Sequence, residues 1–333
     1  MQTSAADFEH RQAAHCESGA ITSLLRHYGL DISEPMAFGL SSSLSFAYLP
    51  FIKIAGLPLI AYRMPPKSIV KGLQKSLGVR MHSETFRSPT KGMARLDELL
   101  AQGQVVGLQT SVFWLPYFPE NMRFHFNAHN LIVYGRDGDE YLISDPVAEM
   151  TVRCARADLE RARFAKGTLA PKGLLYYPAP LSQATITEKM LRTAIWNTVK
   201  VMLYTPLPII GVKGIRMLAR RIAKLKADDL TFNKMYIGHI VRMQEEIGTG
   251  GAGFRFIYAA FLQEVAKLLN DPRFEKHADN LVVIGDQWRE FALNAALMCK
   301  ARKAFDASAL SQQLVAIADA EKIFFNQLKQ DVK

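Results

Sequence analysis

Two hydrophobic patterns divide the chain near residue 180. Before that point, short runs rich in β-branched and aromatic residues mix with helical segments. The clearest expected strands are residues 104–113, 129–135 and 140–145. After it, apolar residues recur almost throughout at helical spacing. The helices expected there are residues 186–203, 212–226, 232–247, 253–270, 277–303 and 307–329.

The break between the two patterns coincides with a proline-rich stretch. Residues 171–189 hold three prolines around a short strand-like GLLYY. We therefore expect an α+β fold with two domains, a mixed domain over residues 1–180 and an all-α domain over residues 181–333. A chain of 333 residues with 49% hydrophobic residues is long enough to bury two such cores.

A cysteine opens the first well-defined helix. Apolar residues follow Cys16 at helical spacing, and Gly29 is a natural stop. The N-terminus of a helix favours a thiolate over a thiol, because its exposed N–H groups and its dipole are positive. The same N–H groups can hold an oxyanion, and the side-chain amide of Gln12 is a candidate second donor. A single cysteine is just as typical of a small buried hydrophobic residue.

One stretch of the first domain predicts a β-hairpin that places a histidine beside a carboxylate. Two β-rich runs flank the turn residues 136–138. With a three-residue loop, residues 135 and 139 pair, and His129 lies directly opposite Asp145 on the same face. A two-residue loop would put the two side chains on opposite faces.

Cys16, His129 and Asp145 together form a candidate catalytic triad. The carboxylate would fix the tautomer of the imidazole and stabilise the imidazolium, while the other ring nitrogen acts on the thiol. Taken singly, His129 is typical of a structural histidine and Asp145 of a turn residue before proline. The order Cys, His, Asp along the chain is that of papain-like enzymes, and the combination predicts a cysteine nucleophile.

Charge and cysteine content narrow the partners and the compartment. The net charge of +10 and the pI near 9.4 favour an anionic partner. Three widely spaced cysteines without a CxxC pair indicate neither a disulfide framework nor a thiolate zinc site. The first residues, MQTSAADFEH, predict no secretory signal, so we expect a cytoplasmic protein.

Much of the positive charge lies between residues 189 and 226, around the most apolar run of the chain. That run, residues 201–218, is interrupted by prolines and basic residues and is unsuited to span a bilayer. Two interpretations stay open. One is a core helix with solvated basic ends. The other is a basic amphipathic segment, residues 195–226, that contacts a membrane surface or an acidic protein.

Several other motifs suggest chemistry that their context does not support. His125 and His129 have HxxxH spacing but lack the glutamate of a zinc peptidase, and we expect no metal. The glycines in residues 248–253 match GxGxxG but follow a helix instead of a strand. That turn and Arg255 could instead hold an anion such as a phosphopantetheine phosphate. We expect no nucleic-acid partner, because the sequence shows no basic face interleaved with stacking aromatic residues.

An ordered set of short motifs resembles a known family. The set comprises the HC pair at residues 15–16, LPYF at 115–118, HFNAH at 125–129, VYG at 133–135 and DP at 145–146. It is similar to the butirosin-biosynthesis acyltransferases, whose amino-terminal domain is called BtrH-like. The segment 246–269 resembles the helical domain that often follows it. Papain-like enzymes commonly place a glutamine six residues before the cysteine, where this chain has His10.

The resemblance implies an acyltransferase with a papain-like fold. Cys16 would take an acyl group from the thioester of an acyl carrier protein, or of coenzyme A, and deliver it to a small-molecule amine. The protein itself would need no cofactor, and a homo-oligomer is compatible with its helical domain. The aromatic stretch 111–126 would keep water out, with Trp114 and Tyr117 lining an acyl pocket. The alternatives are a cysteine peptidase or amidase on the same scaffold and a non-catalytic, membrane-associated binding module.

Overall fold

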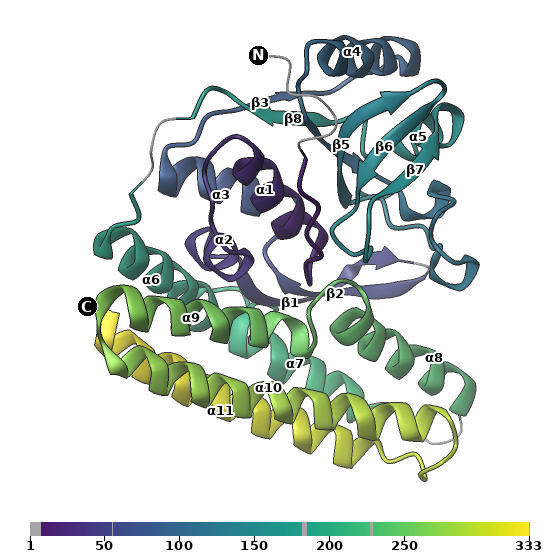
Figure 1. Cartoon of the computed structure of the whole chain (residues 1–333). Helices are drawn as coiled ribbons and strands as arrows, with labels where there is room; N and C mark the ends of the chain where they lie inside the picture. The colour runs from purple at the N-terminus through teal and green to yellow at the C-terminus, as the bar shows by residue number, and fades with distance from the viewer. Residues whose placement is uncertain (1–7, 55, 182–184, 227–228, 333) are drawn as a thin grey trace. The chain divides into compact units, whose positions relative to one another are not determined.

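The computed structural model describes residues 8–54, 56–181, 185–226 and 229–332. The chain forms two compact units. Figure 1 colours the chain by residue number, from purple at the N-terminus to yellow at the C-terminus. The first unit comprises residues 1–37 and 69–185, and the second comprises residues 38–68 and 186–333.

This division differs from the expected boundary near residue 180, because residues 38–68 belong to the second unit. Aromatic contacts explain the difference. Phe38 stacks on Phe254 with ring centroids 5.2 Å apart, and Phe46 stacks on Trp288 at 6.0 Å. The β-strands of residues 38–68 therefore complete the core of the carboxy-terminal helices, and the second unit is not purely α-helical.

The first unit has an α+β fold, as expected. Within the residues described, its antiparallel sheet has the strand order β3-β8-β4-β5-β6-β7. The strands are β3 (Met81–Glu84), β4 (Val106–Thr110), β5 (His129–Asp137), β6 (Glu140–Ser144), β7 (Val152–Ala155) and β8 (Leu175–Pro178). The helices are α1 (Cys16–His27), α2 (Glu34–Leu40), α3 (Ser68–Leu77), α4 (Pro89–Ala101) and α5 (Arg156–Arg163), with α2 and α3 crossing the limits of the unit.

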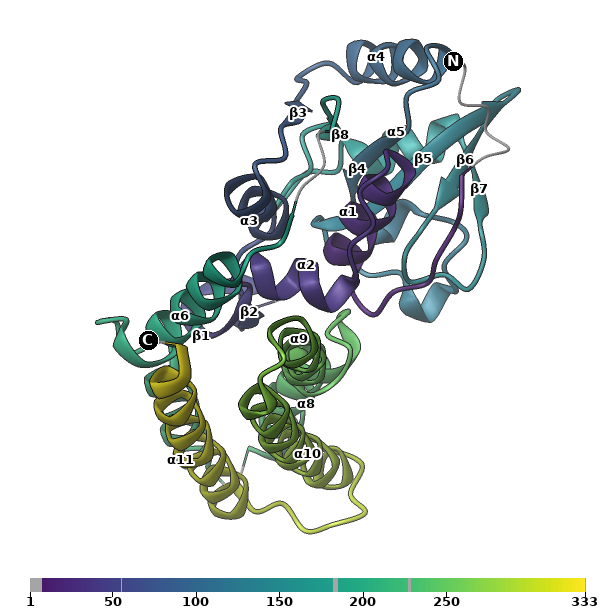
Figure 2. The same cartoon turned by 60° about the vertical axis from the view of Figure 1, so that its left-hand side comes forward.

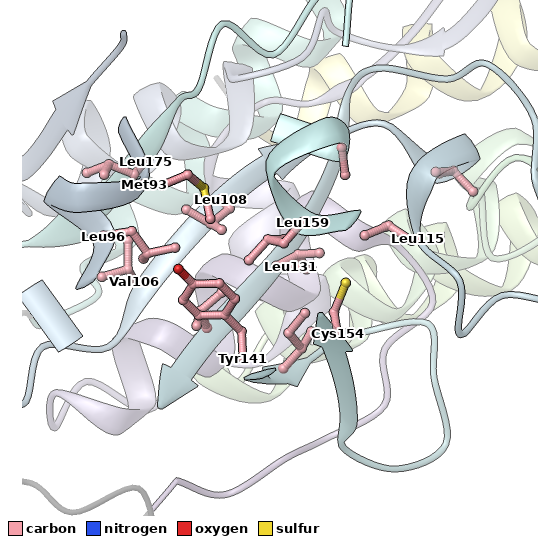
Figure 3. Close-up of a cluster of buried hydrophobic side chains, with 14 of the residues drawn as sticks. Met93, Leu96, Val106, Leu108, Leu115, Leu131, Tyr141, Cys154, Leu159 and Leu175 are labelled. Atoms are coloured by element: carbon pink, nitrogen blue, oxygen red, sulfur yellow. The ribbon is translucent and has the colours of Figure 1, made fainter. Parts of the chain in front are cut away.

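The main core of the first unit lies between the sheet and helices α4 and α5. Figure 3 shows Leu96 of α4 and Leu159 of α5 around the sheet residues Leu108 and Leu131. Leu131 and Val133 of β5 share this face because side chains alternate along a strand. Ile132 between them is also fully buried and points to the other face, where α1 packs against β5 (Figure 2). Both faces of β5 are therefore covered.

The second unit combines a β-hairpin with six long helices among the residues described. The hairpin pairs β1 (Leu44–Ile54) with β2 (Leu57–Arg63), and α10 lies between α9 and α11 (Figure 1). The helices are α6 (Glu188–Tyr204), α7 (Gly211–Ile222), α8 (Leu230–Val241), α9 (Arg255–Leu269), α10 (Pro272–Cys299) and α11 (Ala307–Val332). Each overlaps a helix expected from the hydrophobic pattern, so that part of the prediction is confirmed.

The basic stretch around residues 195–226 forms α6 and α7. The apolar face of α7, which includes Val212, Ile215 and Leu218, is buried against α11 and β1. This burial agrees with the interpretation of a core helix with basic, solvated positions. None of the helices in the described part of the chain is long and apolar enough to cross a membrane.

The first turns of α1 pack very closely against the chain just beyond β6. Ala13 N–H donates a hydrogen bond to the Pro146 carbonyl (2.7 Å). A Cβ atom on Gly19 would lie 2.5 Å from Ala13 Cβ and 2.7 Å from Pro146 Cβ. Only glycine therefore fits at position 19 without moving one of these segments.

We predict that Gly19→Ala destabilises the protein by about 1–3 kcal/mol, because the added methyl overpacks this contact. Gly238→Ala is the matched control. Gly238 lies in α8 and has open space around its Cα, so alanine should be neutral or stabilising there. Chemical denaturation of the three proteins measures the difference, and equal stability of the Gly19 and Gly238 variants would contradict the close contact.

Candidate active site

Cys16 is the first residue of α1, as expected. The His15 side chain caps the helix, with Nδ1 accepting a hydrogen bond from Ser18 N–H (3.3 Å). The carboxylate of Glu34 holds the preceding backbone by accepting from the N–H groups of Ala14 and His15, each at 2.9 Å. Burial raises the pKa of Glu34. Cap and carboxylate together fix the position of the thiol.

The hairpin that carries the histidine has a different register from the expected one. Its closing pair is Asp137 and Glu140, so the loop has two residues, not three. This loop alone would place His129 and Asp145 on opposite faces. The register shifts by one residue between Val133 and Gly135, however, and the shift restores a common face. Continuing the observed register from Ile132 and Ser144 puts Asp145 opposite Leu131, so His129 and Asp145 share a face but are not directly opposite each other as expected.

The structure nevertheless brings His129 and Asp145 into direct contact. His129 Nε2–H donates to Asp145 Oδ2 at 2.6 Å. The Tyr117 hydroxyl donates to the same oxygen at 2.7 Å, and Val147 N–H donates to Oδ1 at 3.1 Å. With three donors, the fully buried carboxylate has a fixed orientation.

The pKa of His129 reflects this pairing. Burial alone would lower it, but the charge and hydrogen bond of Asp145, together with a hydrogen bond to Cys16, raise it to about 10. His129 is therefore an imidazolium at neutral pH. Its Nε2 is engaged by Asp145, which leaves Nδ1 as the nitrogen that serves the thiol.

The three candidate residues are shielded from water. Cys16 is 6% exposed and His129 is 4% exposed. The ring of Phe118 stands edge-on to the imidazole, with centroids 5.6 Å apart. Tyr176 on β8 is buried, and its pKa is raised by burial and then by the nearby charges of Glu17 and Cys16. The arrangement can support nucleophilic chemistry with little competing water.

The other expected site residues lie in different surroundings. Gln12 is exposed, and no hydrogen bond of its amide is seen among the described residues. Trp114 is 37% exposed and lies under the Arg161 guanidinium, 5.8 Å from the ring centroid. Tyr117 was expected to line an acyl pocket, but its hydroxyl is committed to Asp145. Tyr117 therefore supports the triad through the hydrogen bond that its hydroxyl donates to Asp145.

The expectation that Arg255 binds an anionic ligand was wrong. Arg255 and Glu321 are both 0% exposed and form a bidentate ion pair, at 2.9 and 3.1 Å. The remaining guanidinium nitrogen donates to the Gly253 carbonyl (2.7 Å), and Trp288 Nε1 also donates to Glu321 (2.8 Å). The guanidinium is satisfied inside the second unit and has no contact to offer a phosphate.

Sequence reasoning missed two residues that support the site. Glu34 lies 18 residues after Cys16, and nothing in its local pattern marks it as a partner of the helix start. His10 occupies the position of the usual glutamine, but its side chain contacts Ser144 Oγ (2.7 Å) and the Ala148 carbonyl (3.1 Å). Both contacts flank Asp145. His10 therefore supports the carboxylate loop.

Comparison with known proteins finds two family models that match this chain. Residues 15–146 match the family model described as Butirosin biosynthesis protein H, N-terminal, and residues 157–328 match Domain of unknown function (DUF4872). A crystal structure from Bacillus anthracis described as C39-like peptidase has 15% sequence identity and a TM-score of 0.37. The alignment covers 54% of this chain and 97% of that one. Curated proteins give no match.

A cysteine at the start of a helix, facing a histidine and a carboxylate from an antiparallel sheet, defines a papain-like, cysteine-type enzyme. The DUF4872 match alone spans more than half of the chain. The chain therefore belongs to the DUF4872 family, and its amino-terminal part is a BtrH-like domain.

We predict that Asp145→Asn lowers the pKa of His129 well below its value of about 10, because burial continues to lower the pKa while the charge of Asp145 is lost. NMR titration of the His129 ring measures the change. In the wild type the raised pKa also contributes stability, which is complete below pH 6.5 and is lost as the pH rises through about 10. A His129 pKa that stays near 10 in the variant would contradict the assigned pairing.

Proposed function

We propose that the protein is a cysteine-dependent N-acyltransferase. Cys16 takes an acyl group from the thioester of an acyl carrier protein or coenzyme A and passes it to an amine. The main support for this proposal is a buried imidazolium next to a buried thiol in a BtrH-like domain. Exclusion of water favours transfer to an amine over hydrolysis.

In the first step the Cys16 thiolate attacks the carbonyl carbon of the thioester. The oxyanion forms beside the N-terminus of α1, where the Cys16 N–H is a donor that the helix offers. The new C–S bond forms as the bond to the donor sulfur breaks. The His129 imidazolium gives its proton to the departing sulfur, so the products are acyl-Cys16, neutral His129 and a free thiol.

In the second step the amine attacks the same carbonyl carbon. Neutral His129 takes the proton of the amine nitrogen, the bond to Cys16 breaks, and an amide leaves. Thiolate and imidazolium are thereby regenerated. Asp145 keeps His129 oriented through both steps, and Tyr117 fixes Asp145 from the other side.

The proposed donor fits the overall charge of the protein. A net charge of +10 favours an anionic partner, and acyl carrier proteins are typically acidic. The acceptor is a small-molecule amine, and the protein supplies catalytic side chains without a cofactor of its own.

We predict that incubation with acyl-carrier or acyl-CoA thioesters leaves an acyl group on Cys16, detectable by intact-protein and peptide mass spectrometry. Cys16→Ala should abolish the adduct. Cys154→Ala is the matched control and should keep it, because Cys154 is buried in the core and burial raises its pKa to about 12. Addition of a suitable amine should remove the adduct and yield an amide.

Two outcomes would overturn the proposal. An adduct that persists in Cys16→Ala would place the chemistry elsewhere. Absence of an adduct with every thioester, together with cleavage of peptides that depends on Cys16, would assign the same triad to a peptidase.

A further inference from the structure

A second concave site lies entirely within the second unit, and the proposed triad does not use it. It is a pocket of about 480 Å³ formed by the β1–β2 hairpin, the end of α7 and the start of α8. Its basic residues are Lys53 on β1, Arg220 and Arg221 on α7, and Lys224 just beyond α7. We call this pocket the basic groove.

The four cations of the basic groove have no carboxylate partner among the residues that the structure describes. Within residues 8–54, 56–181, 185–226 and 229–332, no ion pair involves Lys53, Arg220, Arg221 or Lys224. Arg216, one turn earlier on α7, is by contrast paired with Asp319. Like charges one helical turn apart, as at positions 220 and 224, repel each other. A group of unpaired cations around one cavity is therefore suited to an anion.

The rest of the basic groove is apolar and aromatic. Phe232 is half-buried and stacks on Tyr236 with centroids 5.7 Å apart. The hydroxyl of Tyr236 contacts that of Tyr48 at 3.2 Å, and Arg221 approaches the same hydroxyl. A volume of this size with apolar walls and a few charged groups is typical of small-molecule sites. It favours a compact anionic group over a flat membrane surface.

We propose that the basic groove binds the phosphate of a phosphopantetheine group, with the geminal methyl groups of its pantoyl part lying along Phe232. This inference rests on the proposed function, because such a group carries the acyl thioester. The same chemistry occurs in coenzyme A and on the serine of a holo carrier protein. Arg220, Arg221, Lys224 and Lys53 would supply charge-assisted hydrogen bonds to the phosphate oxygens.

Direct binding tests the proposal without any catalysis. Calorimetry should show that coenzyme A and 4′-phosphopantetheine bind the protein. Pantetheine, which lacks the phosphate, should bind with lower affinity. The double variant Arg220→Gln/Lys224→Gln should bind both phosphate ligands at least about tenfold more weakly, because two charged contacts are lost. Lys200→Gln/Arg302→Gln removes two exposed cations outside the groove and should bind like the wild type.

A parallel experiment distinguishes the two sources of the phosphate, coenzyme A and a holo carrier protein. If coenzyme A does not bind but a holo carrier protein binds more tightly than its apo form, and the groove variant loses the difference, the donor is the carrier protein. Binding of vesicles rich in phosphatidylglycerol that depends on the groove, without binding of any phosphopantetheine ligand, would overturn the proposal in favour of a membrane surface. Equal affinities of the groove and control variants would overturn it as well.

Acyl loading of Cys16 separates this proposal from the function on which it rests. Loading is measured on the same wild-type protein as phosphate binding. Absence of loading in the wild type, with phosphate binding intact, would refute the acyltransferase and not the groove. Loading of the wild type, without binding of any phosphate ligand, would refute the groove and not the acyltransferase.

Discussion

The contact between His129 and Asp145 is the constraint on which the candidate active site depends. Removing a charged group from water costs on the order of several kcal/mol of hydration free energy. An ion pair with additional hydrogen bonds is needed to offset that cost. Here the carboxylate receives hydrogen bonds from His129, Tyr117 and the backbone of Val147, and His129 also interacts with Cys16. Loss of one side chain leaves another buried polar group without its partner, so Cys16, Tyr117, His129 and Asp145 form one cooperative unit.

The packing of α1 brings the thiol to this unit. Gly19 allows the helix to approach Pro146, the residue that follows Asp145, and Ala13 is hydrogen-bonded to the same proline. On the other side of the helix start, Glu34 holds the backbone before Cys16. The nucleophile and its base come from segments more than 100 residues apart, and these short contacts set their separation.

Local pattern was enough to predict most elements but not their long-range partners. The helices after residue 186 follow the period of their apolar residues, and the helix from Cys16 ends before Gly29 as its sequence indicates. The pair His129 and Asp145 was anticipated through a register that was wrong, since nothing in the sequence marks the irregularity at the middle of β5. The two side chains still share one face of the sheet, because the two-residue loop alone would put them on opposite faces and the irregularity in β5 reverses that effect.

Tertiary contacts account for the remaining errors. Arg255 suggested an anion site, and only the fold shows that Glu321, 66 residues later, neutralises it in the core. The β1–β2 hairpin belongs with helices that begin more than 100 residues after it, because Phe46 and Tyr62 of the hairpin pack against Trp288 of α10. Such partners are set by packing across the chain, which composition and periodicity do not encode.

The central claim is that the pair of His129 and Asp145 keeps an imidazolium beside Cys16 and so makes its sulfur reactive at neutral pH. Its most direct test is the rate at which iodoacetamide alkylates Cys16 between pH 6 and pH 9, in the wild type and in His129→Gln, followed by peptide mass spectrometry. We predict fast alkylation of Cys16 in the wild type, and alkylation at least about tenfold slower in the variant across this range, because the variant has no imidazolium beside the sulfur. Equal rates in the two proteins would contradict the claim.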